Sequence, residues 1–200
     1  VGGMDASDLR GRTILVTGAN AGIGYWCVEQ LATRGARVLL GCRSAERAAT
    51  AVDAVRTRVP DADLRVLPLD LGSLESVAQA ASGIGETLDA VICNAGVKAA
   101  TPDARTADGL DLMVGTNFLG HFALIAQLGR ALAPDARVVA VGSLAHRFAQ
   151  LRERFAQRLL ARLLLGQERD LSVRAQCGDE DRHAHERRAR DRETLITSGV

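Results

Sequence analysis

The sequence predicts an α/β protein in which helices cover both faces of a doubly wound parallel sheet. Short apolar runs of strand length alternate with segments of helical periodicity between residues 13 and 143. The runs are nearly continuous in their apolar character, as expected of strands buried on both faces. A glycine-rich turn follows directly after the first run. With right-handed crossovers, this order of elements favours parallel pairing of the strands.

Five apolar runs are predicted to be strands. They lie at residues 13–17, 36–41, 64–69, 88–93 and 136–142. Strands and helices that alternate in this way form a Rossmann-type sheet, for which we expect the strand order 3-2-1-4-5. No similar run follows the fifth, so the sheet is expected to be incomplete at its C-terminal side.

Helices are predicted between these runs from their periodicity and their capping residues. The first covers residues 23–34 and ends before a glycine. Ser44 is expected to cap a second helix that extends to Arg58, and Ser73 a third, because serine accepts a hydrogen bond from the first turn. A long helix is predicted at residues 107–133, although three glycines interrupt it.

The glycine turn is a candidate site for a diphosphate. Its spacing is Gly-x-x-x-Gly-x-Gly, between the first strand and the first helix. Glycine permits the backbone angles of a tight turn and lets the main chain approach a phosphate closely, while the N-terminus of the following helix attracts anions. An ordinary tight turn is the alternative. The residues expected to bind a nucleotide here are Gly18, Asn20, Gly22, Ile23 and Gly24.

The residue after the second strand bears on the choice of nucleotide. A protein that binds NAD usually carries an acid at this point, whereas this chain carries Arg43. A guanidinium can hold the 2′-phosphate of NADP through paired hydrogen bonds. We therefore expect NADP rather than NAD, with a solvated surface arginine as the alternative.

These motifs and their order resemble the short-chain dehydrogenase/reductase family over residues 13–148. Residues 17–24 match the family's Thr-Gly-x-x-x-Gly-Ile-Gly, and the later strand ends carry two more of its motifs. Asp70 and Leu71 resemble its adenine-contacting pair, and the segment Asn94, Ala95 and Gly96 resembles the one that shapes the floor of its cofactor cleft. The resemblance implies an oxidoreductase that transfers hydride between NADP(H) and a small-molecule alcohol or carbonyl.

Two catalytic residues are implied by the same resemblance. Asn117, in the predicted long helix, would anchor a water in a proton relay, although it could instead be a polar residue that disturbs a buried helix. Ser143 matches the serine that hydrogen-bonds the substrate oxygen. His121 is either an imidazole in the pocket or a satisfied helix histidine. Residues 137–148 look most like the retinol-dehydrogenase-like branch, which suggests a lipophilic substrate.

The family's proton-transfer motif is absent from this chain. That chemistry needs a tyrosine followed four residues later by a lysine, one helical turn apart. The chain has one tyrosine, Tyr25, and its lysine is Lys98, so neither follows Ser143. We therefore expect catalysis to be lost or very weak. The rival hypothesis is a non-catalytic NADP-binding or interaction protein.

The composition changes near the end of the resemblance. Residues 151–200 contain 11 of the 25 Lys and Arg residues and 9 of the 24 Asp and Glu residues. We therefore predict an NAD(P)-binding domain at residues 1–147 and a divergent charged tail at 148–200, partly helical or disordered. Because acids interleave with its arginines, a solvated tail is favoured over one that binds nucleic acid.

A slip of reading frame between Phe148 and Leu160 would explain the change. Permitted codons for residues 160–168, read from the second base, can encode W-R-A-Y-S-S-A-K. This reading places a tyrosine opposite Leu163 and a lysine opposite Gln167, which restores the missing spacing. Part of this match depends on which codons are assumed, because the genetic code is degenerate.

The overall composition excludes several classes of function. A net charge of +1 offers no general argument for nucleic acid or membrane binding. No apolar run is expected to reach transmembrane length, and the first twelve residues are too polar for a signal peptide, so we expect a cytoplasmic protein. The 4 cysteines are scattered, which argues against a zinc site, and no metal is expected. The sequence does not indicate an oligomeric state.

Overall fold

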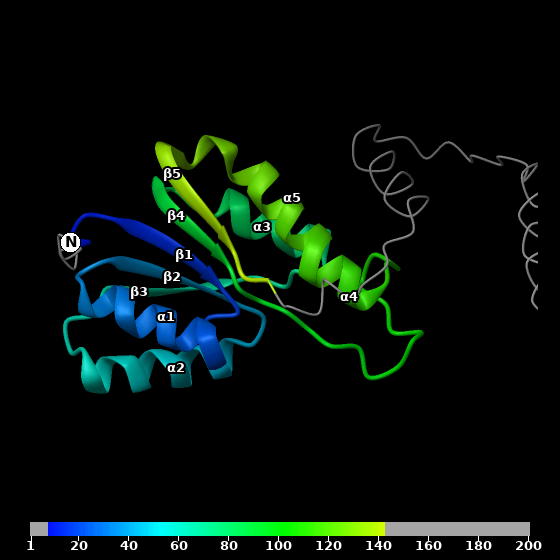
Figure 1. Ribbon diagram of the computed structural model, residues 1–200, viewed down its shortest axis with the longest axis horizontal. Coiled ribbons are helices and arrows are strands. Elements are labelled where there is room, and N and C mark those ends of the chain that lie inside the picture. Colours follow the sequence, from blue (N-terminus) through cyan, green and yellow to red (C-terminus); the bar gives the residue numbers. More distant parts are fainter. Residues whose placement is uncertain (1–7, 143–200) are drawn as a thin grey trace, which may run out of the picture. The chain divides into compact units, whose positions relative to one another are not determined.

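The computed structural model describes residues 8–142 of the 200-residue chain. Five parallel strands form one sheet in the order β3-β2-β1-β4-β5, which confirms the predicted topology (Figure 1). The strands are β1 (Thr13–Thr17), β2 (Arg37–Cys42), β3 (Leu64–Pro68), β4 (Leu88–Cys93) and β5 (Leu132–Ala140). Ser143 and the predicted tail lie outside the described residues.

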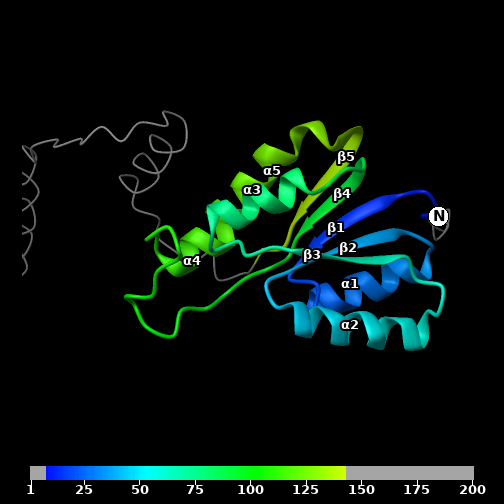
Figure 2. The same ribbon diagram turned by 180° about the vertical axis from the view of Figure 1, so that it is seen from behind.

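Helices cover the two faces of the sheet, with α1 and α2 on one face and α3 and α5 on the other (Figure 1, and from behind in Figure 2). Successive strand residues point to opposite faces. Thus Ile14 and Val16 of β1 lie in the core beneath α1 and α2, whereas Leu15 lies in the core beneath α3 and α5. The helices are α1 (Gly22–Thr33), α2 (Ala45–Arg58), α3 (Leu74–Ser82), α4 (Leu112–Val114), the π-helix η1 (Gly115–Gly120), α5 (His121–Gln127) and the 3-10 helix η2 (Leu128–Arg130).

Both predicted serine caps are confirmed. The Ser44 hydroxyl accepts a hydrogen bond of 3.3 Å from the backbone N–H of Arg47 at the start of α2. The Ser73 hydroxyl does the same for Ser76 in α3, at 3.2 Å. Each cap satisfies a backbone donor that has no partner within its helix.

The predicted helix at 107–133 is wrong at both ends and in its regularity. Helical structure begins only with α4, where the Asp111 carboxylate caps the N–H of Val114 at 2.9 Å. The π-helix η1 comes next, followed by α5 and η2, and helical structure ends at Arg130. Gly120 does not interrupt the helix. It allows close packing, because a Cβ there would overlap the carbonyl oxygen of Leu71.

Strand β5 also differs from its prediction. It begins at Leu132, and its pairing with β4 shifts register between Leu88 and Ala90, whose partners are Leu132 and Arg137. The extra residues include Pro134, which has no N–H to donate and is tolerated at such an irregularity. Val138 and Val139 are 48% and 47% exposed, so the expectation of cover on both faces is wrong for β5 within residues 8–142.

One stretch of the described chain, Leu112–Arg130, is long and apolar enough to cross a membrane by length and composition alone, with a mean hydropathy of 1.3 over its best window. The sequence-based expectation was that no run would reach this length. In the fold the stretch packs against α3 and the sheet, and Leu119, Leu124 and Leu128 are almost fully buried. Its place in the core accounts for the hydropathy of these leucines, whereas Phe118 and Phe122 of the same stretch are 56% and 48% exposed.

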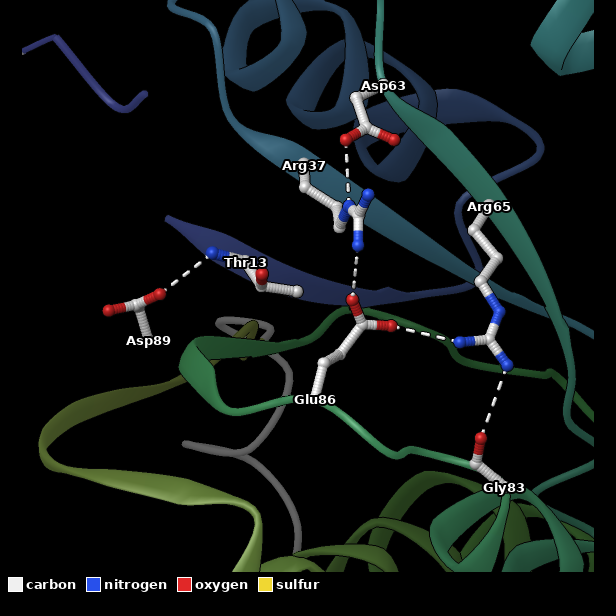
Figure 3. A network of polar contacts seen from close by, with 7 residues as sticks. All are labelled: Thr13, Arg37, Asp63, Arg65, Gly83, Glu86 and Asp89. Atoms are coloured by element: carbon white, nitrogen blue, oxygen red, sulfur yellow. Dashed lines mark hydrogen bonds and ion pairs between the residues drawn. The ribbon is translucent and has the colours of Figure 1, made fainter. Parts of the chain in front are cut away.

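The amino ends of the strands are joined by ion pairs (Figure 3). Glu86, which precedes β4, accepts hydrogen bonds of 2.9 Å from both Arg37 and Arg65. Arg37 also donates to Asp63 at 2.7 Å, and Asp89 accepts from the backbone N–H of Thr13 at 2.8 Å. These contacts link β1, β2, β3 and β4 at the edge opposite the one that carries the glycine turn.

Candidate functional site

The candidate site lies at the carboxyl end of β1, where the glycine turn leads into α1. Gly18 and Gly22 have φ angles of 63° and 54°, in the left-handed region that favours glycine. At Gly24 a Cβ would overlap the Gly18 carbonyl oxygen and lie 2.5 Å from the side-chain nitrogen of Asn94. All three glycines of the motif are therefore required by the geometry of the turn.

The N-terminus of α1 faces this turn without a side-chain cap. Ala21 is the capping residue and makes no side-chain hydrogen bond to the helix. The first N–H groups of the 12-residue helix are thus left for another acceptor, and the helix dipole makes this end attractive to an anion. Asn20 is half-buried beside it. Ile23 is 64% exposed, so its apolar surface is free to contact a bound ligand.

The segment after β4 packs against the glycine turn and holds it in place. The side-chain amide of Asn94 donates to the carbonyls of Thr17 at 3.0 Å and Gly18 at 3.3 Å. Ala95 packs so closely that a Cβ on Gly18 would lie 2.8 Å from the Ala95 Cα. Gly96 is exposed and adjoins Asn117, whose Oδ1 would lie 3.7 Å from an added Cβ. The structure therefore brings these residues and the glycine turn together.

Thr17 and His121 form the centre of this support. The Thr17 hydroxyl accepts hydrogen bonds of 3.0 Å from the backbone N–H groups of Asn94 and Ala95. Its oxygen lies 2.9 Å from Nε2 of His121, whose Nδ1 lies 3.0 Å from the carbonyl oxygen of Asn117. Burial lowers the pKa of His121. His121 is therefore a satisfied helix histidine rather than an imidazole open to substrate.

Asn117 lies in η1 and is tied to the loop after β4. Its Oδ1 accepts from the Val97 N–H at 2.7 Å, and its Nδ2 donates to the Val97 carbonyl at 2.9 Å. An amide has two donor hydrogens and two acceptor lone pairs, so each end keeps one hydrogen-bonding position. Asn117 is exposed, and short π-helical segments such as η1 are frequent at functional sites.

Arg43 and Asp70 follow the two neighbouring strands. Arg43 comes directly after β2, is exposed, and its guanidinium takes part in no ion pair or hydrogen bond within residues 8–142. The Asp70 carboxylate accepts from the Gly72 N–H at 2.9 Å and so shapes the turn after β3. Leu71 is only 6% exposed and packs in the core. Of these three residues, Arg43 has the side chain most available to a ligand.

One supporting residue was missed by reasoning from the sequence. Thr17 was noted only as part of a motif, although its hydroxyl holds the segment after β4. Cys42, at the end of β2, is 3% exposed and packs in the core, and burial raises the pKa of its thiol. A polar side chain at the end of a strand, next to a glycine turn, is the signal that could have identified Thr17.

Tyr25 is remote from proton-transfer chemistry. Its hydroxyl lies 2.6 Å from an Arg58 nitrogen and donates to Glu29 at 3.2 Å, while the Arg58 guanidinium covers the ring of Trp26. These contacts join α1 to α2, so Tyr25 packs there. In the described part of the chain no three His, Cys, Asp or Glu side chains gather as a metal site would require.

Similarity to known proteins agrees with this geometry. The sequence model of the short chain dehydrogenase family matches residues 12–152. WW domain-containing oxidoreductase of Drosophila melanogaster is 38% identical over 153 residues, which cover 74% of this chain and 37% of the relative. Retinol dehydrogenase 11 of Homo sapiens is 38% identical over 148 residues, covering 72% and 46%. The chain spans less than half the length of either relative.

Solved structures give the same result. A short-chain dehydrogenase/reductase from Serratia marcescens is 26% identical with a TM-score of 0.60, over 80% of this chain and 66% of that one. The RhlG/NADP complex from Pseudomonas aeruginosa is 28% identical with a TM-score of 0.57, over 80% and 69%. The resemblance expected from the motifs is thus confirmed over most of the described residues, and the chain belongs to the short chain dehydrogenase family.

Proposed function

We propose that this protein binds NADP(H) at the carboxyl edge of its sheet. We further propose that its function is that of an oxidoreductase, which transfers hydride to or from an alcohol or carbonyl substrate. Members of its family are oxidoreductases that bind nicotinamide cofactors. The relative named retinol dehydrogenase supports a lipophilic substrate. The cofactor would supply or accept the hydride.

The residues present fit a dinucleotide. Gly18 and Gly24 let the turn pack closely where a Cβ would overlap backbone atoms, whereas a Cβ at Gly22 would meet nothing within 4 Å. The uncapped N-terminus of α1 offers N–H groups to a diphosphate. Asn94 and Ala95 hold that turn in place from the neighbouring strand. Asp70, Leu71 and Gly96 occupy the adjoining strand ends, where the adenine and the nicotinamide ribose would lie in a sheet of this type.

Arg43 is the observation that favours NADP over NAD. Its exposed guanidinium follows β2 without a protein partner among residues 8–142, at the strand end next to the glycine turn. Such a group can bind a 2′-phosphate through two parallel hydrogen bonds. Hydrogen bonds to a charged group contribute about 1.5–3 kcal/mol. We therefore expect Arg43→Ala to weaken NADP binding roughly 10- to 150-fold and to leave NAD binding nearly unchanged.

The experiment is a fluorescence titration of the full chain with NADPH and NADH. Arg56→Ala is the matched control, because Arg56 is an exposed arginine in the last turn of α2. If Arg43→Ala and the control retain the same ratio of NADPH to NADH affinity, the assignment of Arg43 is wrong.

Catalysis itself depends on few residues of this chain. Ser143 would hydrogen-bond the substrate oxygen, and Asn117 would anchor a water through the free positions of its amide. A positioned proton-transfer group contributes on the order of 10²–10⁴-fold. Without the Tyr-x-x-x-Lys motif we expect turnover to fall by a factor of this size.

A non-catalytic NADP-binding protein is the second candidate function. The observation that favours it is the position of the chain's single tyrosine, which is hydrogen-bonded between α1 and α2. Turnover of a panel of alcohols and aldehydes separates the candidates. Nucleotide binding without turnover would establish the second, and robust turnover would establish the first.

A further inference from the structure

A buried hydrogen-bonded chain connects the glycine turn with η1 through one histidine. Nε2 of His121 lies 2.9 Å from the Thr17 hydroxyl oxygen, and Nδ1 lies 3.0 Å from the Asn117 carbonyl oxygen. Thr17 and His121 are 104 positions apart in the sequence, and each is less than 10% exposed. The imidazole therefore joins the end of β1 to the π-helix η1, which contains Asn117.

Counting donors and acceptors assigns the protons. A carbonyl oxygen can only accept, so Nδ1 of His121 must carry the hydrogen that is donated to Asn117. A threonine hydroxyl has one hydrogen and two acceptor lone pairs. The backbone N–H groups of Asn94 and Ala95 both donate to the Thr17 hydroxyl oxygen at 3.0 Å and so occupy its two lone pairs. The Asn94 N–H also donates to the Ile92 carbonyl.

The Thr17 hydrogen is therefore free to be donated. Its two possible acceptors are Nε2 of His121 at 2.9 Å and the Ile92 carbonyl at 3.3 Å. The shorter contact favours donation to Nε2, which must then lack a hydrogen. A hydrogen on Nε2 would instead present a third donor to an oxygen that already accepts two.

We propose that His121 is a positioning residue, held as the neutral Nδ1–H tautomer, that fixes the Asn117 carbonyl and η1 relative to the diphosphate turn. It contacts no substrate and acts through Thr17 and Asn117. Thr17 in turn orients Asn94 and Ala95, which support Gly18. The part of this inference that concerns nucleotide affinity rests on the proposed NADP site, whereas the part that concerns the tautomer does not.

Two substitutions separate the two hydrogen bonds that the imidazole ring of His121 makes. His121→Gln places an amide oxygen near the position of Nε2, so it can accept from Thr17 but cannot reach Asn117. His121→Asn places an amide nitrogen near the position of Nδ1, so it can donate to Asn117 but leaves the buried Thr17 hydroxyl only its longer contact of 3.3 Å with the Ile92 carbonyl. We expect His121→Gln to retain NADPH affinity within about threefold and His121→Asn to lose about tenfold, because only the second disturbs the turn.

The test combines nitrogen-15 NMR of the histidine rings with NADPH titration, both on the full chain. The signals of His121 are assigned by their loss in His121→Gln. We expect a protonated Nδ1 and an unprotonated Nε2 at neutral pH. An imidazolium or an Nε2–H tautomer would overturn the proposal, as would equal NADPH affinities for the two variants. If the wild-type chain does not bind NADPH, the proposed function fails, and the NMR result alone decides the tautomer.

Discussion

Replacing Gly24 with alanine tests how tightly the glycine turn is packed. The added Cβ would overlap the carbonyl oxygen of Gly18 and lie 2.5 Å from Nδ2 of Asn94. That nitrogen donates to the carbonyls of Thr17 and Gly18, so both obstacles belong to one hydrogen-bonded unit. The methyl group can be accommodated only if the turn opens or the Asn94 side chain leaves it.

The expected loss of stability follows from these contacts. Overpacking costs about 1–3 kcal/mol, and each displaced hydrogen bond costs about 1 kcal/mol. We expect Gly24→Ala to lower the free energy of unfolding by roughly 2–4 kcal/mol. At about 2–4 °C for each kcal/mol, the melting temperature should fall by roughly 4–16 °C.

Nucleotide binding should weaken as well. With the dinucleotide bound as proposed, opening the turn would remove at least one backbone hydrogen bond to a phosphate, a loss of about 1.5–3 kcal/mol and roughly 10- to 150-fold in the dissociation constant. Thermal melting by circular dichroism and NADPH titration measure the two effects. Gly85→Ala is the control, because a Cβ at Gly85 meets nothing within 4 Å and its φ is not positive. If both variants melt and bind alike, the close approach at Gly24 is refuted.

Three further predictions concern stability and the coding sequence. Burial lowers the pKa of His121 below its ordinary value of 6.5, so its contribution to stability is complete above that pH and is lost as the pH falls toward the lowered pKa; urea melts at pH 7.5 and 5.5 should show a smaller difference for His121→Gln than for the wild type. Glu86→Gln should lower the stability more at low than at high salt, because it breaks the ion pairs with Arg37 and Arg65, whereas Asp8→Asn, at an exposed pair, should have little effect in the same melts. Resequencing the coding DNA should reveal a frame slip between Phe148 and Leu160, and a clean frame whose Leu163 codon does not end in A would contradict that hypothesis.

Short-range chemistry in the sequence was enough to predict most elements of the fold. Ser44 and Ser73 were identified as caps because a cap is a hydrogen bond to a backbone group three residues away. The apolar runs predicted all five strands, and their alternation with helices, typical of a Rossmann-type sheet, predicted the strand order. The glycine turn was recognised for a similar reason, since its backbone angles depend on residues within one motif.

Predictions failed where the outcome depended on neighbours from elsewhere in the chain. Gly120 was expected to interrupt a helix, but it lies where that helix touches the backbone of Leu71, a contact between segments that are distant in the sequence. The register shift of β5 depends on its pairing with β4, which apolar periodicity does not encode.

The surroundings of the candidate site were decided by tertiary structure in the same way. The sequence places the glycine turn and Arg43 at the ends of strands and Asn117 within a helix, but it left the role of His121 open. The contact between Thr17 and His121 spans 104 positions and exists only because the end of β1 and the start of α5 meet in the fold. Hydrogen-bonding capacity is a property of each residue, whereas the choice of partner depends on strand order and register, which only the folded chain determines.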